Sequence, residues 1–415
     1  MRSRLLAVAI AASLGVSGLT PFAAAAQSQT PADSSAELAQ LRAELAELQS
    51  KVDQLQQQQA QTQAQVQTQA VSAPSSGSDD SRLTALEKAV NDTTIGGKMY
   101  FDYTNIDQKN SKTGKTNTSG TGIDVKRFYL SVTHKFNDIW SANLTTDFNY
   151  SSTLGQTSLF VKKAYVQGKF DQAAVLRIGS ADMPWIPFVE DYYGYRYVEN
   201  TLTDRLKYAN SADWGINMSG DLGDSKYVNY SVSAVNGNGY KNPSRSNSVD
   251  FEGRVGFVPF KGLVVAVGGY TGDRGQGLEN VNTVHTAQRV DFLAAYAGPQ
   301  FRAGAEYFNA KNWNNVLTSV TDKADGYSFW GSVNLPDDFS LFARYDHASL
   351  SKDLNPSAKD VYYNAGIQYA VTKGFQLALV YKHEKGDVSS STAVLPQPLA
   401  NVKTDEVGVF GQVAF

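Results

Sequence analysis

The chain contains no cysteine, which excludes disulfide bonds, thiolate metal sites and a cysteine-linked lipid anchor. Beyond its N-terminal segment it has no long apolar run, so membrane-spanning helices are excluded there. Its 37 basic and 40 acidic residues give a net charge of −3, which argues against nucleic acid as a partner. The four histidines are dispersed, and none has the paired spacing of a zinc-binding helix. Neither a metal nor another cofactor is expected.

From about residue 95 to the C-terminus, sixteen short stretches alternate apolar and polar residues. In the first of them, Phe101 and Tyr103 alternate with Asp102 and Thr104. Side chains on a strand point alternately to two faces, so each stretch predicts a strand with one apolar and one wet face. A water-soluble sandwich would show the same alternation, and the links between the stretches separate the two possibilities.

These links are by turns short and long, as in an outer-membrane barrel with turns at one rim and loops at the other. The seven short links are 137–139, 170–173, 223–226, 259–262, 298–300, 336–338 and 372–374. Eight longer links, rich in Gly, Ser, Asn and Lys, include 108–122, 185–211, 236–248, 272–283, 348–360 and 386–404. Fifteen connections join sixteen strands. Residues 95–415 are therefore predicted to form an all-β, 16-stranded antiparallel transmembrane β-barrel whose two ends lie on the turn side.

Residues 1–26 have the pattern of a secretory signal peptide. Arg2 and Arg4 precede an apolar stretch over residues 5–16, and small residues lead to Ala26. The alternative, a membrane anchor, fits less well because the stretch is short. Export of a chain without cysteine points to the bacterial envelope, so we expect the barrel in the bacterial outer membrane.

Residues 27–70 show the spacing of a coiled coil, with Leu38, Leu45 and Val52 seven residues apart and Leu41 and Leu48 three residues after the first two. Such a seam is buried against partner helices, and three of them would match a homotrimer of barrels. The alternative is a partly helical spacer without a partner. Because the first strand starts on the turn side, this coil is expected in the periplasm, where it could bind peptidoglycan.

Residues 71–94 are predicted to form a Ser-, Pro- and Gly-rich linker and one short helix. The helix is indicated by Leu83, Leu86 and Val90, which have the spacing of one helical face.

Strict alternation places nine bases and nine acids on the inner wall. The bases are Lys98, Arg127, Lys163, Arg177, Arg254, Arg289, Arg302, Arg344 and Lys382, and the acids are Asp102, Asp147, Asp213, Asp250, Glu252, Asp291, Glu306, Asp346 and Glu406. The first five strands carry the first four bases but only the first two acids, so one wall is basic. A row of cations in a narrow channel can pass an anion from site to site. Alternatively, these bases pair with carboxylates across the lumen.

The third long link, residues 185–211, is rich in aromatic and charged side chains, which are Tyr192, Tyr193, Tyr195, Tyr197, Tyr208, Arg196, Arg205, Lys207, Glu190, Asp191, Glu199 and Asp204. This composition suits a loop that folds into the barrel as a constriction. A loop of this composition outside the barrel would be unusually adhesive.

Three segments resemble the phosphate-selective porin O and P family: DVKRFYLSVTHKFND (124–138), SLFVKKAYVQGKF (158–170) and VLRIGSADMPWIPF (175–188). One departure is Lys126 with Arg127 where the family pattern has two arginines. The resemblance implies trimers of 16-stranded barrels that conduct phosphate or related anions. By that resemblance, Arg127, Tyr129, Lys163 and Arg177 are pore-lining anion contacts, and Arg196, Arg205 or Lys207 supplies the constriction. Alternation adds Lys98 to the pore-lining contacts, and the composition of the third long link adds Tyr192 to the constriction loop.

The sequence thus predicts an outer-membrane porin for passive diffusion of small anions, with phosphate or polyphosphate as the leading substrate. A general or cation-preferring porin and an inert barrel that tethers the envelope remain as alternatives. No group of residues predicts catalysis, although a Ser and His pair on the barrel wall, as in an outer-membrane lipase, is a further alternative.

Overall fold

The computed structural model describes residues 50, 51, 53, 54, 57, 77–151, 156–243, 245–387 and 401–415. The predicted signal peptide and almost all of the predicted coiled coil lie outside these residues. The chain divides into two compact units, Met1–Arg82 and Leu83–Phe415. The predicted short helix is present as α2 (Gly77–Asn91), and its Leu83, Leu86 and Val90 are exposed. Within the described residues, no helix has the length and apolar character needed to span a bilayer.

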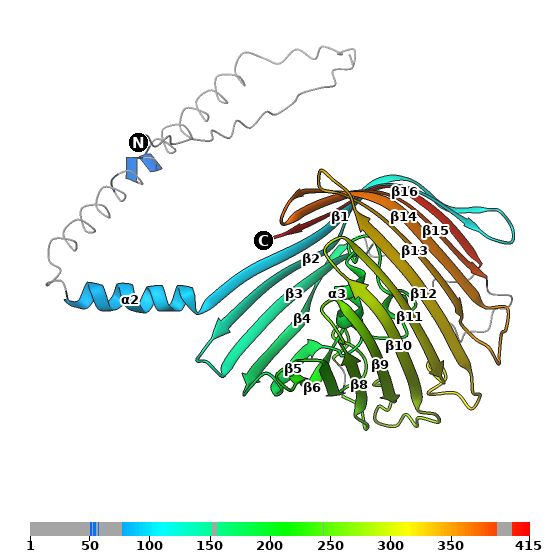
Figure 1. The fold of residues 1–415 in the computed structure, drawn as a ribbon, viewed down its shortest axis with the longest axis horizontal. Coiled ribbons are helices and arrows are strands. Elements are labelled where there is room, and N and C mark those ends of the chain that lie inside the picture. The colour runs from blue at the N-terminus through cyan, green and yellow to red at the C-terminus, as the bar shows by residue number, and fades with distance from the viewer. Residues whose placement is uncertain are drawn as a thin grey trace, which may run out of the picture. The chain divides into compact units, whose positions relative to one another are not determined.

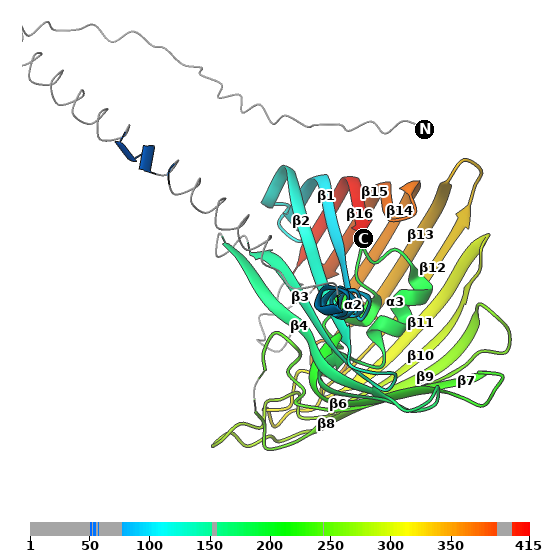
Figure 2. The same ribbon diagram turned by 90° about the vertical axis from the view of Figure 1, so that its left-hand side faces the viewer.

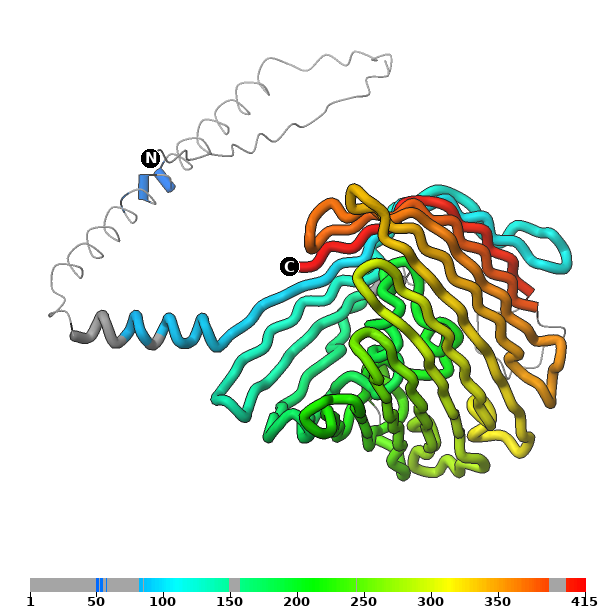
Figure 3. Tube along the Cα trace, in the orientation of Figure 1, coloured from blue at the N-terminus to red at the C-terminus, as the bar shows by residue number. Residues whose placement is uncertain are grey.

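Sixteen antiparallel strands close into a single barrel, as predicted. Their bounds are β1 Thr93–Asn110, β2 Thr116–Lys135, β3 Trp140–Ser151, β4 Gln156–Lys169, β5 Val175–Asp182, β6 Ala212–Leu222, β7 Val228–Val235, β8 Asp250–Phe257, β9 Leu263–Gly272, β10 Ala287–Ala297, β11 Phe301–Lys311, β12 Lys323–Asn334, β13 Phe339–Ser349, β14 Lys359–Thr372, β15 Phe375–Asp387 and β16 Val402–Ala414. Each strand pairs with its neighbours in sequence (Figure 1). The first and last strands close the ring, from Lys98 opposite Ala414 to Asn110 opposite Val402 (Figure 3).

A short turn follows every second strand, as the sequence predicts. Seven short turns link β2 to β3, β4 to β5, β6 to β7, β8 to β9, β10 to β11, β12 to β13 and β14 to β15. The prediction for the first long link was wrong: β1 and β2 remain paired as far as Lys109 and Thr116, so residues 111–115 alone form this connection. Its Thr, Ser and Gly residues extend the ladder instead of forming a loop.

The two faces of the wall have opposite character. On the outer face, large apolar side chains such as Ile123 and Leu159 are 73% and 71% exposed, as a lipid-facing surface requires. On the inner face, carboxylates such as Asp147 and Asp291 are fully buried. Exposed aromatic residues lie near both strand ends: Tyr307, Tyr327, Tyr345, Tyr363 and Tyr381 towards the loops, and Phe136, Trp140, Phe170, Phe260, Phe301 and Phe339 towards the turns. These positions match the two interfacial girdles of an outer-membrane barrel.

Candidate functional site

The link between β5 and β6, residues 183–211, lies inside the barrel, and we call it the constriction loop. It contains two short helices, α3 (Ile186–Tyr193) and α4 (Leu202–Arg205). Figure 2 shows α3 enclosed by the ring of strands. Trp185, Tyr197 and Tyr208 of this loop are at most 1% exposed, because the strands surround them. The loop therefore narrows the lumen, as its composition suggested.

Trp185 fixes the start of the constriction loop. Its indole Nε1 donates to Glu306 on β11 at 2.9 Å, and its backbone N–H donates to Glu252 on β8 at 3.0 Å. The ring packs directly over Gly268 on β9, where a Cβ atom would lie 2.6 Å from the nearest ring carbon. Only glycine leaves room for this ring.

We therefore expect Gly268→Ala to displace Trp185 and to lower the stability of the barrel by about 1–3 kcal/mol. Thermal unfolding in detergent measures the loss. Gly269→Ala is the matched control, because its Cβ would face outward at an ordinary 3.5 Å from the nearest atom. Equal melting temperatures for the two variants would contradict the close packing of Trp185 on Gly268.

Aromatic packing continues along the loop. Tyr195 stacks on Phe342 of β13 with ring centroids 4.1 Å apart, and Tyr193 meets Trp330 of β12 edge-on at 5.8 Å. Tyr197 donates from its hydroxyl to Gln368 on β14 at 2.7 Å. These contacts all lead to β12–β14, so the loop rests on that side of the barrel.

Charged contacts hold the loop to the same side. Arg205 of α4 reaches three carboxylates, at 3.1 Å from Asp346, 2.5 Å from Asp360 and 2.6 Å from Glu384. Burial alone would lower the pKa of Arg205, but these carboxylates raise it well above its usual value. Within the predicted constriction loop, the Arg205 guanidinium is thus surrounded by three acids on β13–β15. Arg205 anchors the loop.

Glu199 makes the reciprocal contact, since its carboxylate lies 2.8 Å from the Lys382 ammonium on β15. Burial alone would raise the pKa of Glu199, but Lys382 and Lys126 hold it well below its usual range. Lys382 is also 2.8 Å from Glu406 on β16. The charge of Lys382 is therefore compensated by Glu199 and Glu406, as the charge of Arg205 is by its three carboxylates.

The bases of β10 and β13 are also paired. Arg289 contacts Asp291 at 2.8 Å and Glu252 at 3.0 Å, and Arg344 contacts Asp346 at 2.6 Å. The pairing alternative therefore holds for this side of the lumen. Arg254 and Arg302 instead donate to backbone carbonyls of the constriction loop, at Pro184 and Asp191. The bases of the wall that line the open part of the lumen lie on the opposite side, along β1–β5.

On that opposite side, two β-bulges turn extra lysines inward. In the β1–β2 ladder, Tyr100 pairs with Arg127 but Phe101 pairs with Val125, so Lys126 is the extra residue. In the β3–β4 ladder, Thr145 pairs with Lys163 but Thr146 pairs with Val161, so Lys162 is the extra residue. A bulge opposes two residues to one and breaks the alternation. The side chains of the adjacent bases Lys126 and Arg127 therefore both point into the lumen, and so do those of Lys162 and Lys163.

Strict alternation had counted only Arg127 and Lys163 as inward, so it missed Lys126 and Lys162. A signal was present in the sequence. A lysine that points into lipid from the middle of a barrel strand costs about 2–4 kcal/mol. Two consecutive bases within an otherwise amphipathic strand therefore predict a bulge there.

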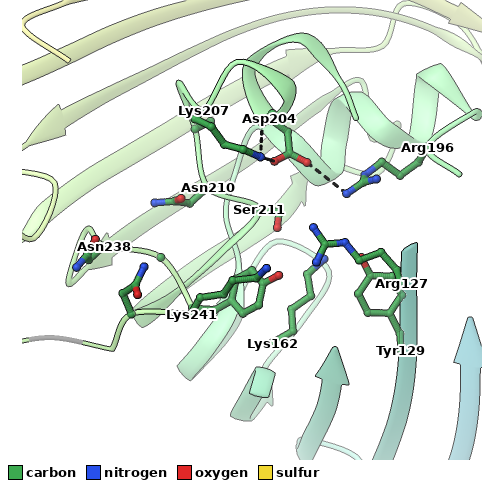
Figure 4. Close-up of a pocket in the computed structure, with 14 residues that line it drawn as sticks. Arg127, Tyr129, Lys162, Arg196, Asp204, Lys207, Asn210, Ser211, Asn238 and Lys241 are labelled. Carbon is green, nitrogen blue, oxygen red and sulfur yellow. Dashed lines mark hydrogen bonds and ion pairs between the residues drawn. The ribbon is translucent and has the colours of Figure 1, made fainter. Parts of the chain in front are cut away.

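A cavity of about 200 Å³ lies between this wall and the constriction loop, on the side of the long loops (Figure 4). Five basic side chains and one acidic side chain line it, and these are Arg127, Lys162, Arg196, Lys207, Lys241 and Asp204. The Lys162 ammonium lies over the rings of Tyr129 and Tyr240, 4.7 Å and 5.9 Å from their centroids. We call this space the loop-side cavity.

A second cavity of about 340 Å³, the turn-side cavity, continues from the first and shares Tyr129, Lys162 and Arg196 with it. It also contains Lys98 and Lys163 together with the acids Asp182, Glu190 and Asp191. The charge of this lining is nearly balanced, whereas that of the loop-side cavity is strongly positive. The three shared residues mark the passage between the two.

The bases at this passage differ in how they are paired. Arg127 lies 3.1 Å from Asp147, and Lys163 lies 2.5 Å from Asp182. Arg196 lies 2.6 Å from Glu190, and this charge helps to raise its pKa well above the usual value despite burial. Within the described part of the chain, no carboxylate comes within 4.0 Å of Lys162. Lys162 is thus the cation at the passage with the least local compensation.

Three other residues of the predicted site differ in whether they line these cavities. Arg177 binds Gln167 at 2.8 Å and Ser219 at 3.3 Å, and it lines neither cavity. Tyr192 packs on Phe188, with ring centroids 5.3 Å apart, and it too lines neither cavity. Lys207 does line the loop-side cavity, with its side chain 59% exposed.

A family model described as phosphate-selective porin O and P matches residues 93–270, which span β1–β9. Over this segment, which is less than half of the chain, the protein is similar to that family. The match confirms the resemblance seen in the sequence, and it covers both bulges and the constriction loop. No curated protein matches the chain at a significant level.

Solved structures share the fold of this chain at low sequence identity. An anion-selective porin from Comamonas acidovorans has 14% identity and a TM-score of 0.54, over 78% of this chain and 99% of that one. The outer-membrane channel DcaP of Acinetobacter baumannii has 12% identity and a TM-score of 0.55, over 78% and 97%. OmpF of Salmonella typhi, in complex with daunomycin, has 14% identity and a TM-score of 0.53, over 77% and 97%.

Proposed function

We propose that this porin conducts small anions by passive diffusion, with phosphate or polyphosphate as the leading substrate. The observation that carries the proposal is the loop-side cavity, where five bases face one acid at the narrowed part of the lumen. Such a lining raises the local concentration of anions and lowers that of cations. The cations are spread along the passage, so an anion can be bound and passed on.

The chemistry of the passage suits an oxyanion. Arg127 and Arg196 present planar guanidinium groups and Lys162 a compact ammonium, which are the groups that bind phosphate oxygens through charge-assisted hydrogen bonds. Lys98 and Lys163 extend the same chemistry towards the turns. One structure of the same fold is that of a porin described as anion-selective, which supports the general class.

Single-channel recording tests whether phosphate binds in the passage. Chloride current through the purified porin in a planar bilayer is measured while inorganic phosphate is titrated in. We expect phosphate to reduce the chloride current in a saturable way, because it occupies the passage. A current that responds only to the change in total ionic strength would reject phosphate binding and leave a general diffusion porin.

The cavity should also respond to pH through Lys241, which lies in the β7–β8 loop (residues 236–249) and lines the loop-side cavity. Burial first, and the charge of Arg127 second, lower the pKa of Lys241 to about 8. The side chain is therefore charged below that pH and neutral above it. We expect the preference for chloride over potassium to fall roughly threefold between about pH 7 and about pH 9, the effect of one charge at about 6 Å in water.

Lys241→Gln should remove this pH step and hold the low-preference value throughout. Lys207→Gln is the matched control, since it removes another lysine of the same cavity but should leave the step in place. Reversal potentials in a chloride gradient give the preference. An identical pH step in all three proteins would assign the titration to another group.

Two further proposals concern the segment before the barrel. The heptads of residues 27–70 support a homotrimer with a periplasmic coiled coil, and a coil on that side could bind peptidoglycan. If the barrel were an inert tether, it would bind peptidoglycan but show no conductance. A cation-preferring porin would show the opposite sign of reversal potential.

A further inference from the structure

The loop-side cavity is larger than an inorganic phosphate ion needs. Its volume of about 200 Å³ equals that of roughly seven water molecules in the liquid, at about 30 Å³ each. A phosphate ion takes the place of only about two or three of them. The cavity therefore has room for a second, uncharged group beside the phosphate.

Uncharged polar side chains complete the lining of this cavity. Asn210 and Ser211 end the constriction loop, and Asn238 and Asn242 belong to the β7–β8 loop. Figure 4 shows Asn210 and Asn238 at one end of the cavity and Arg127 at the other. The cavity thus has a basic end and an amide end.

The amides differ from the bases in the hydrogen bonds that they offer. An asparagine side chain has both N–H donors and a carbonyl acceptor, whereas lysine and arginine side chains only donate. The oxygens of an ionised phosphate accept hydrogen bonds, so they satisfy the bases but leave an amide oxygen without a donor. A hydroxyl group both donates and accepts, so it satisfies the whole amide. The amide end therefore matches a ligand that carries several hydroxyl groups.

The β7–β8 loop is held against the basic wall. The buried carboxylate of Asp213 on β6 accepts the backbone N–H groups of Gly237 and Gly239, at 3.0 Å and 3.1 Å. The hydroxyl of Tyr240 donates to Asp147 on β3 at 2.7 Å. The fold therefore sets the spacing between the amides and the bases before any ligand binds, and such preorganisation lowers the cost of binding.

The same loop also places Asn210. Gly239 has a φ of +75°, and a Cβ atom there would lie 3.0 Å from the amide carbon Cγ of Asn210. A glycine at this position allows both the left-handed backbone and the close approach of the two loops. Amides from the constriction loop and from the β7–β8 loop therefore form one surface.

We propose that the loop-side cavity selects sugar phosphates, which are phosphate monoesters of polyhydroxyl compounds, over phosphate compounds without hydroxyl-bearing carbon. The phosphate group lies among Arg127, Lys162 and Arg196, and the hydroxyl groups lie against Asn210 and Asn242. This inference rests on the proposed function, because the same bases have to attract the anion. The amides add a preference among phosphate compounds that charge alone cannot provide.

Reduction of the chloride current by two phosphate esters tests this inference in a planar bilayer. Glucose 6-phosphate carries hydroxyl groups, whereas ethyl phosphate has a similar charge and none. At neutral pH, we expect the half-saturating concentration of glucose 6-phosphate for the wild-type protein to be about tenfold lower, from about threefold for each of two amides. Glucose at the same concentrations should leave the current unchanged, because it lacks the anionic group.

N210A/N242A should remove this preference, so that both esters act at about the same concentration. The matched control is N247A, because Asn247 is an exposed asparagine of the β7–β8 loop that does not line the cavity. This control should keep the wild-type preference. The comparison of the two esters on the wild-type protein needs no variant, so a variant that fails to fold cannot hide a negative result.

The outcomes separate this inference from the proposed function. If the two esters acted at equal concentrations on the wild-type protein while inorganic phosphate still reduced the current, this inference alone would be overturned. If neither ester nor inorganic phosphate reduced the current, both would be rejected. An unchanged preference in N210A/N242A would overturn the assignment of the hydroxyl contacts to the amides.

Discussion

Lys162→Glu should shift the channel from anion towards cation preference. The substitution changes the charge at the passage by two units, and two charges about 6 Å apart in water interact by about 0.7 kcal/mol per unit, so the permeability ratio should change about tenfold or more. Lys162 is the residue of choice because no described carboxylate lies within 4.0 Å of it. Arg127→Glu would instead leave Asp147, which is fully buried, beside a second acid.

Reversal potentials in a potassium chloride gradient measure the effect. Arg177→Glu is the matched control, since Arg177 also lies on the basic side but lines neither cavity. The account requires a large change for Lys162→Glu and little change for Arg177→Glu. If Arg177→Glu changed the reversal potential as much as Lys162→Glu, or more, ion selectivity would not be set at the passage.

Arg205→Ala should release the constriction loop. The substitution removes the cation next to Asp360, which is fully buried, and Glu384, whereas Asp346 keeps its contact with Arg344. Removing one partner of a buried ion pair costs about 3–5 kcal/mol, and the carboxylates would have to take up protons or water. We expect a lower melting temperature, a larger and noisier single-channel current and a weaker preference for anions.

Lys207→Ala serves as the comparison, because Lys207 is 59% exposed and lies 3.8 Å from Asp204, a contact worth at most about 1 kcal/mol. Current amplitude and noise are recorded in the same bilayer for both variants. If Arg205→Ala kept the wild-type amplitude, noise and melting temperature, the loop would be held by its aromatic contacts alone.

Much of the barrel could be predicted from the sequence because its pattern is local. Alternation, link length and terminal aromatics each depend on a few neighbouring residues, and they predicted the sixteen strands and the seven turns correctly. The first long link was mispredicted for the same reason: Thr, Ser and Gly usually indicate a loop, whereas here pairing with β1 keeps residues 116–122 in a strand.

The candidate site was harder to predict because it depends on contacts distant in sequence. The partners of Arg205 lie 141, 155 and 179 residues away, and Asp360 and Glu384 were not among the predicted inward acids. Lys126 and Lys162 were missed because a bulge changes the face of a residue without changing the composition of its strand. The inward fold of the constriction loop was foreseen from its tyrosines and charges, but which of those charges remain open to the lumen was not.

The most direct test of the account is the reversal potential of the wild-type protein in a planar bilayer that separates two concentrations of potassium chloride at neutral pH. The account predicts a potential with the sign of chloride permeation, because anions cross beside Arg127, Lys162 and Arg196. A potential with the sign of potassium permeation would contradict it.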